Sequence, residues 1–403
     1  MSHRFGIIRR FRFNRPQRIA AGLLTLFLLQ GFWLISRQTL SDQDYQYARC
    51  GRETWEKPSP LAGYYTSCGN IRDGILAYRL AGLPLTLNLL AERAIDPFRK
   101  PENRVVQEQG AGIGTWELRH QMTHILLLLR LPFLFAGCLL GGCIWWVSRR
   151  LYGNFGGYTA LALYCFSPAI LKACVSPNPE AWAALGVYGG VYTCIGVAHA
   201  MQGPRRKWRP RILLLIAIFG VTACAHIVAL PIAALLGFAG MLWVAEDHRS
   251  QTLPVVLTAS LGALLIVFAC YGFSPDACSY VFRSADAFLW ISLDPAKRFF
   301  TSLSNGGIIV AACAAFVLYL ALRRSRYFGN TAPLLCAIVL MLLIMTGAPG
   351  TPWLWSLPFL FTFIGGVFAD TYEGPRGRIA LYAGGAIILA QMTLCILTLP
   401  TLV

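Results

Sequence analysis

Two acidic side chains, Asp42 and Asp44, lie two positions apart in the segment 41–48 (SDQDYQYA), directly after an apolar run. A carboxylate in such a place can act as a general base that takes the proton from a hydroxyl group. Ser41 or Asp42 could equally cap the start of a short helix. The two roles are compatible if one acid caps the helix and the other does chemistry.

A third acid, Glu180, follows Pro179 between two later apolar runs, where it could stabilise the N-terminus of a helix. Several other chemistries lack their sequence motif. The chain has no GxxxxGK[ST] phosphate loop, no HExxH or CxxC metal motif and no GxSxG nucleophile.

The composition places these acids in a membrane protein. Of the 403 residues, 56% are hydrophobic and 13% are charged, which is too apolar for an average soluble chain. The net charge of +17 does not indicate a nucleic-acid partner, because the basic residues stand at the ends of apolar runs.

Eleven apolar stretches approach the length of about 20 residues that a transmembrane helix needs. They are 19–36, 131–148, 156–174, 181–201, 212–225, 227–245, 253–272, 306–322, 332–347, 353–369 and 379–399. The fifth and sixth run together almost without a break, so we expect His226 and Pro231 to mark a tight turn between them. The sequence predicts an all-α polytopic protein of about eleven transmembrane helices.

The distribution of Lys and Arg predicts the orientation. Six arginines precede the first apolar run, and further basic clusters follow the second, fourth, eighth and tenth runs, whereas the large loop 37–130 is nearly neutral. The positive-inside rule then places the N-terminus in the cytoplasm and the loop and C-terminus outside. The N-terminal stretch is typical of a retained signal anchor, and a bacterial inner membrane fits it.

The loop 37–130 is the one sizeable segment outside the predicted spans, and we expect it to be part of a single membrane domain, 1–403. Six apolar residues in it recur at spacings of three and four: Leu76, Leu80, Leu83, Leu87, Leu90 and Ala94. A helix beginning near Pro84 could lie on the membrane surface, or the stripe could pack the loop onto the bundle. Trp116 to Leu129 predicts a second interfacial stretch. Cys50 and Cys68 share the loop, and whether they form a disulfide stays open.

The order of several short motifs resembles the C-type glycosyltransferases, a superfamily that includes the protein O-mannosyltransferases and the lipid A aminoarabinose transferases. The similar segments are Asp42, Asp44, Tyr47 and Ala48; Tyr78–Leu85; Leu129–Pro132; Arg149–Gly153; Phe166–Pro168; and Glu56-Lys57-Pro58. The chain departs from the pattern where Ala81 and Leu83 replace Pro and Tyr and where Gln43 separates the acids. No soluble domain follows the last predicted span, so we expect a minimal member.

The resemblance implies a sugar donor linked to polyprenyl phosphate, whose leaving phosphate cations would stabilise at the outer membrane surface. Candidate cations are Arg79, Arg130, Lys172, His226, Arg283, Lys297 and Arg298, of which Lys172 and Arg130 are favoured. Many interfacial cations only extend their charge to the surface, so we expect two or three of the seven to contact phosphate. The resemblance also implies that Glu180 positions a substrate or a metal ion, and that Glu56 and Lys57 contact sugar or phosphate.

Together these inferences predict a membrane glycosyltransferase, in which Asp42 or Asp44 deprotonates an acceptor hydroxyl that attacks the sugar with inversion. The acceptor would be a lipid-linked molecule, a glycan or a protein. The sequence identifies no certain cofactor, although the acids could bind a divalent metal ion. The alternatives are a transporter or flippase for a lipid-linked sugar and a non-catalytic scaffold of envelope glycan assembly.

Overall fold

A computed structural model describes residues 14–56, 74–95, 122–273, 275, 289–291, 301–321, 327–345, 352–375 and 377–403. The helices are α1 (Arg15–Arg37), α2 (Asp42–Glu56), α4 (Ile75–Ile95), α6 (Met122–Cys165), α7 (Pro168–Val175), α8 (Glu180–Met201), α9 (Arg205–Ala225), α10 (Ala229–Val244), α11 (Arg249–Cys270), α14 (Gly306–Ala321), α15 (Tyr327–Leu342), α16 (Pro352–Tyr372) and α17 (Gly377–Thr398). Short 3₁₀ turns lie at Glu246–His248, Leu303–Asn305 and Leu399–Leu402. Two three-residue strands, β1 (Leu289–Ile291) and β2 (Leu343–Met345), pair antiparallel.

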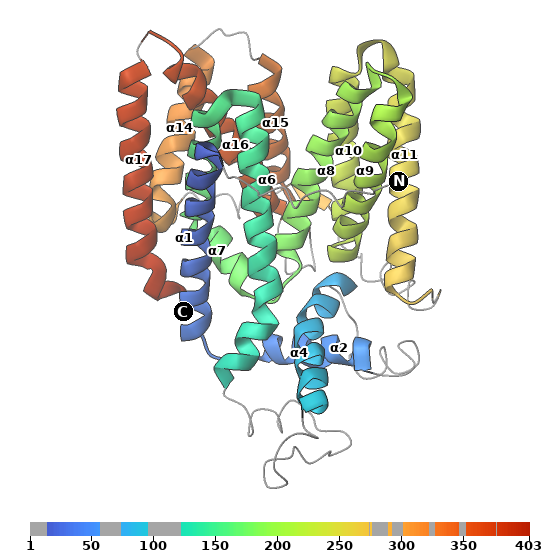
Figure 1. Cartoon of the computed structure of the whole chain (residues 1–403). Helices are drawn as coiled ribbons and strands as arrows, with labels where there is room; N and C mark the ends of the chain where they lie inside the picture. The colour runs from blue at the N-terminus through green and yellow to red at the C-terminus, as the bar shows by residue number, and fades with distance from the viewer. Residues whose placement is uncertain are drawn as a thin grey trace, which may run out of the picture.

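The all-α membrane architecture is confirmed. Eight of the described helical segments are long and apolar enough to cross a membrane, and α10 and most of α15 form shorter apolar helices. These helices run roughly parallel in one bundle (Figure 1). α6 covers two predicted spans, because its 44 residues turn back at Gly153, which has a positive φ of 78° that favours glycine. The chain is an integral membrane protein.

The third predicted span, 156–174, is not continuous. α6 ends at Cys165, Ser167 adopts an extended conformation, and α7 begins at Pro168. A proline at this position cannot donate the backbone hydrogen bond that would continue the helix. The expected turn after α9 is confirmed at His226, since the Ala229 amide donates to the His226 carbonyl at 3.0 Å. Pro231 does not mark the turn, because it lies inside the first turn of α10.

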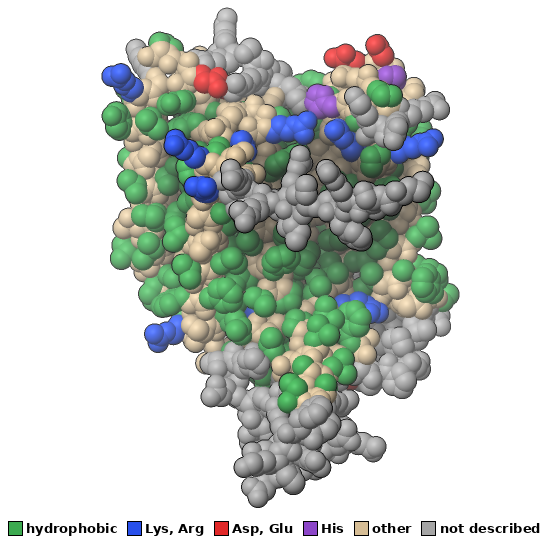
Figure 2. Space-filling model, in the orientation of Figure 1, with side chains coloured by type: hydrophobic (Ala, Val, Ile, Leu, Met, Phe, Trp, Pro, Cys, Tyr) green, Lys and Arg blue, Asp and Glu red, His purple; other side chains and the backbone are tan. Residues whose placement is uncertain are grey.

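α2 and α4 lie at the same end of the bundle as α7 and the C-terminus (Figure 1). Lys and Arg side chains gather mostly toward the opposite end, above a broad hydrophobic band (Figure 2). The orientation of the bundle in the membrane stays a prediction from the sequence.

α2 and α4 form a hairpin whose helices touch backbone to backbone. A Cβ on Gly82 would lie 2.1 Å from the carbonyl carbon of Gly51, so only glycine permits this crossing. Tyr47 of α2 stacks on Tyr78 of α4 at 4.3 Å between ring centroids. Tyr47 also packs edge-on against Phe133 of α6 at 6.4 Å. These aromatic contacts fix the hairpin against the second transmembrane pass.

The predicted start of a helix near Pro84 is wrong, because α4 begins at Ile75 and Pro84 lies inside it. α4 also stands steeply beneath the bundle rather than flat across it (Figure 1). Its buried face includes Tyr78 and Leu85, whereas Leu87 and Leu90 of the predicted stripe are about half exposed. The stripe is thus the face left outside the hairpin. The predicted interfacial stretch 116–129 is described only from Met122, where it is the start of α6.

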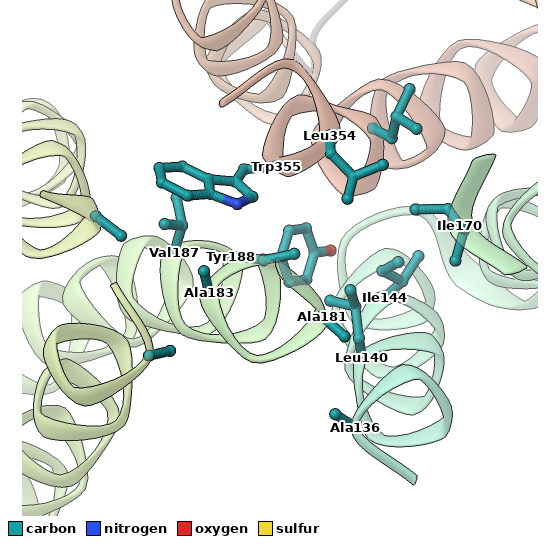
Figure 3. Close-up of a cluster of buried hydrophobic side chains, with 14 of the residues drawn as sticks. Ala136, Leu140, Ile144, Ile170, Ala181, Ala183, Val187, Tyr188, Leu354 and Trp355 are labelled. Atoms are coloured by element: carbon teal, nitrogen blue, oxygen red, sulfur yellow. The ribbon is translucent and has the colours of Figure 1, made fainter. Parts of the chain in front are cut away.

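The deepest part of the core surrounds α16, in whose membrane-spanning part 94% of the residues are buried. Figure 3 shows Leu354 and Trp355 of α16 facing Val187 and Tyr188 of α8, close to side chains of α6 and α7. Trp355 and Tyr188 are completely buried. This packing fixes the N-terminal end of α16, which lies next to the charged residues described below.

Candidate functional site

The central feature of the site is an ion pair between Asp44 of α2 and Arg130 of α6. The guanidinium donates two hydrogen bonds to the carboxylate, from Nε to Oδ1 at 2.9 Å and from Nη2 to Oδ2 at 2.6 Å. Both side chains are buried, with 0% of Asp44 and 5% of Arg130 exposed. Such bidentate geometry is among the strongest that an arginine makes. The pair fastens the first-loop hairpin to the start of the second transmembrane pass.

Asp44 is also the acid of a helix cap. The Ser41 backbone N–H and hydroxyl donate to Asp44 Oδ2 at 2.9 and 2.6 Å, and the Asp44 amide donates to Ser41 Oγ at 3.2 Å. This reciprocal pattern is a capping box with aspartate in place of glutamate. Both carboxylate oxygens of Asp44 are therefore engaged.

Asp42 differs from Asp44 because its side chain is exposed, in the first turn of α2. Gln43 beside it donates from Nε2 to the Pro177 carbonyl at 3.2 Å, which joins α2 to the turn between α7 and α8. Glu180 lies three residues further along this turn. The acids predicted from two distant stretches of the sequence thus lie at the same end of the bundle, with their segments in contact.

Glu180 belongs to a buried cluster with an aromatic and an imidazole side chain. Trp355 Nε1 donates to Glu180 Oε2 at 2.8 Å, and the ring of His226 packs edge-on against Trp355 at 5.5 Å. Glu180 and His226 are each 6% exposed. Burial lowers the pKa of His226, in the turn after α9, from 6.5 to about 4. The imidazole is therefore neutral at pH 7 and is not the cation that the sequence suggests at this position.

Lys172 and Arg79 have contrasting surroundings. Lys172 lies exposed in the last turn of α7 and forms no ion pair with a described residue. Arg79 donates from Nε to the Cys270 carbonyl at 3.0 Å, and its guanidinium lies 5.2 Å from the centre of the Trp55 ring. Lys172 is thus an accessible cation, whereas Arg79 joins α2, α4 and α11.

Some predicted residues fall outside the described part of the chain. These are Lys57, Arg283, Lys297 and Arg298, and the side chain of Glu56, whose backbone ends α2. Cys50 is disulfide-bonded. Its partner also lies outside the described residues, so the proposed Cys50–Cys68 bridge stays a prediction.

Sequence reasoning missed Trp355 and Gln38. Gln38 Oε1 accepts a hydrogen bond from Arg130 Nη1, while its Nε2 donates to the Leu402 carbonyl at 2.9 Å. Trp355 looked like one of the interfacial aromatics that anchor transmembrane helices. The one feature of the sequence that could have indicated its role is its position near the start of a predicted span, at the same end of the bundle as Glu180.

The described helices form a polytopic membrane bundle, and comparison with solved structures confirms the predicted resemblance at the level of the fold. No protein-family model and no curated protein matches the sequence. The chain is similar to ArnT from Cupriavidus metallidurans, with a TM-score of 0.55 and 14% identity over 92% of this chain and 64% of ArnT. ArnT has been solved both in the apo state and bound to undecaprenyl phosphate.

The oligosaccharyltransferase of Archaeoglobus fulgidus has the same fold. Its apo form matches with a TM-score of 0.55 and 11% identity over 96% of this chain and 56% of that chain. The enzyme, AglB, has also been solved with an inhibitory peptide and a dolichol-phosphate. The present chain spans less than two thirds of the length of these matched structures.

Proposed function

We propose that this protein is a membrane glycosyltransferase that moves a sugar from a polyprenyl-phosphate donor to an acceptor hydroxyl. The observation that carries the proposal is the meeting of the acid motif with Arg130 and with the Pro177–Glu180 turn at one end of a bundle with this fold. The lipid phosphates bound to ArnT and AglB support the donor class. The acceptor is a lipid-linked molecule, a glycan or a protein.

Asp42 serves as the general base in this proposal. Asp44 carries four hydrogen bonds from Arg130 and Ser41 on its two carboxylate oxygens, so it has no open position toward an acceptor. Asp42 is exposed on the same turn. Its carboxylate takes the proton of the acceptor hydroxyl as that oxygen attacks the anomeric carbon. The bond from this carbon to the phosphate oxygen breaks with inversion, and polyprenyl phosphate leaves with the electron pair.

The phosphate requires a cation, and Lys172 is the exposed one among the candidate cations whose side chains are described. Its ammonium, at the end of α7, stabilises the negative charge that develops on the leaving phosphate. Arg130 supports the site indirectly, because its guanidinium is occupied by Asp44 and Gln38. Arg79 and the segments carrying Glu56, Lys57 and Arg298 provide further contacts to the substrate in this proposal.

A divalent metal ion does not fit the acid motif in this arrangement. Asp44 is neutralised by Arg130, and within the described ranges no three Asp, Glu, His or Cys side chains come together. The proposed reaction therefore uses no metal-dependent step.

The charge pattern of the sequence supports a proposed membrane placement. We place the protein in a bacterial inner membrane, with the N-terminus in the cytoplasm and the α2–α4 end in the periplasm. Single cysteines introduced at exposed Asp42 and at exposed Asp247, at the opposite end, should react with a membrane-impermeant maleimide from opposite sides of the membrane. Reaction of both from the same side would contradict the arrangement.

The function is tested by transfer from a radiolabelled polyprenyl-phosphate sugar pool in proteoliposomes. Asp42→Asn should reduce the rate of label transfer by about 100-fold or more, because it removes the base. Asp247→Asn, at the opposite end, should leave transfer unchanged. Full activity of Asp42→Asn would show that Asp42 is not the general base. Movement of intact donor across the membrane without transfer would identify a flippase instead, and tolerance of every acid substitution in a correctly assembled protein would identify a scaffold.

A further inference from the structure

His226 presents an unexplained nitrogen inside the site. Its backbone is satisfied, since its amide donates to the Thr222 carbonyl at 2.8 Å and its carbonyl accepts from Ala229. Its ring packs on Trp355 and is 6% exposed. No described residue makes a hydrogen bond to the buried Nδ1 atom.

A buried polar atom without a partner is energetically costly, so proteins almost always supply a partner. The chain could avoid this cost with an apolar residue in the same turn. Trp355 instead holds the imidazole in place on one side and donates to Glu180 on the other. The arrangement keeps a neutral imidazole and a carboxylate at fixed positions, as a ligand-binding site requires.

The chemistry of the cluster selects hydroxyl groups over phosphate. The Glu180 carboxylate would repel an anion, and the neutral His226 ring carries no charge to offset it. Both groups hydrogen-bond well to hydroxyls, which can donate to the carboxylate and either donate to or accept from an imidazole. A sugar ring offers several hydroxyls on one rigid frame.

The position of the cluster suits the sugar of a donor whose phosphate lies nearby. The Gly74 amide donates to the Ala225 carbonyl at 3.0 Å, so the start of α4 is attached to the turn that carries His226. Gln43 attaches α2 to the turn that carries Glu180. The cluster is therefore adjacent to the first-loop hairpin.

We propose that His226 Nδ1 and the Glu180 carboxylate, oriented by Trp355, form a subsite for the hydroxyl groups of the transferred sugar. This inference rests on the proposed glycosyltransferase function. It assigns sugar recognition to the ends of α8, α9 and α16 and phosphate recognition to Lys172 on α7.

The test measures binding to the full-length protein in nanodiscs. The probes are undecaprenyl phosphate alone and undecaprenyl phosphate linked to glucose, mannose or 4-amino-4-deoxyarabinose. The wild-type protein should bind at least one sugar-linked probe more tightly than undecaprenyl phosphate. His226→Ala should weaken the binding of that sugar-linked probe by about three- to tenfold, which is the contribution of one hydrogen bond. It should leave the Kd of undecaprenyl phosphate unchanged. His199→Ala, an exposed histidine at the far end of α8, is the matched control and should change neither.

Trp355→Phe is a second variant that keeps an aromatic ring but loses the N–H that orients Glu180. It should reduce the same gain, and melting curves of both variants verify that they fold. An equal loss for all probes in His226→Ala would assign the residue to folding or to phosphate and overturn the subsite. A wild-type protein that binds undecaprenyl phosphate but gains nothing from any sugar would mean that only water meets Nδ1, and would also overturn it. No binding of undecaprenyl phosphate would instead contradict the proposed function itself.

Discussion

The Asp44–Arg130 pair makes a quantitative prediction about stability. Replacing Arg130 by Gln leaves the Asp44 carboxylate buried, with 0% exposed, and without its counter-charge. Breaking a buried pair from one side costs about 3 to 5 kcal/mol, far more than the pair itself contributes relative to an apolar replacement. Two charge-assisted hydrogen bonds of about 1.5 to 3 kcal/mol each give a similar sum. We expect the same cost for Asp44→Asn.

The expected loss in the free energy of unfolding corresponds to a lower melting temperature. Unfolding entropy of about 2.1 cal/mol/K per residue gives about 0.8 kcal/mol/K for a chain of 403 residues, so the midpoint should fall by about 4 to 6 °C. The assay is the thermal melting of purified protein in detergent, followed by tryptophan fluorescence. Arg49→Gln is the matched control, because Arg49 pairs with Glu53 at 3.6 Å on the same α2 helix but is 63% exposed. That pair should change the midpoint by about 1 °C or less.

The double variant Asp44→Asn, Arg130→Gln completes the cycle. It leaves no uncompensated charge, so its loss should be smaller than the sum of the two single losses by about 2 kcal/mol or more. Single variants that melt within about 1 °C of the wild type, or losses that simply add, would refute the reasoning that this pair joins the first loop to the bundle.

Three further predictions concern other parts of the site. Gly82→Ala should loosen the α2–α4 hairpin and sharply reduce transfer, because the new Cβ would lie 2.1 Å from the Gly51 carbonyl carbon. Gly22→Ala is the control and should do neither, because no atom lies within 4 Å of its Cβ. Equal activity of the two variants would contradict the close crossing of α2 and α4. The pKa of His226 is about 4 in the folded protein and 6.5 in the unfolded chain, so between these pH values the unfolded chain binds a proton that the folded protein does not. The free energy of unfolding should therefore fall by up to about 3 kcal/mol as the pH drops from 6.5 to 4. His226→Gln should flatten that part of the melting profile, and an unchanged profile would show that the imidazole is not buried in the neutral form. Washing the protein with a chelator should leave transfer unchanged, and recovery only on adding a divalent ion would contradict the metal-free reaction.

The transmembrane passes could be predicted from the sequence because each is a long apolar run with charges at its ends. Breaks within a run were harder to predict. Pro168 ends one helix and starts another, whereas Pro84 lies inside α4, since a helix tolerates proline when surrounding contacts compensate. Local sequence does not distinguish these two cases.

The site could be predicted in its parts but not in its pairings. Asp44 and Arg130 were both candidates, yet their contact joins positions 86 residues apart. That contact decides which acid is open, and it depends on how α2 packs against α6. Trp355 could not be found from residue type, because interfacial tryptophans are common and only the three-dimensional packing brings this one to Glu180.

The site draws its groups from parts of the protein that are held very differently. Trp355 sits on the most deeply packed helix, so the side chains around it cannot move without disturbing the core. Asp42 sits on a hairpin that is held at the edge of the bundle by separate contacts, among them those of Tyr47, Arg130 and the turn at Pro177. If the proposed function holds, chimeras that exchange residues 38–95 for the equivalent loop of another protein with this fold should therefore keep the donor preference of the recipient while acquiring a new acceptor.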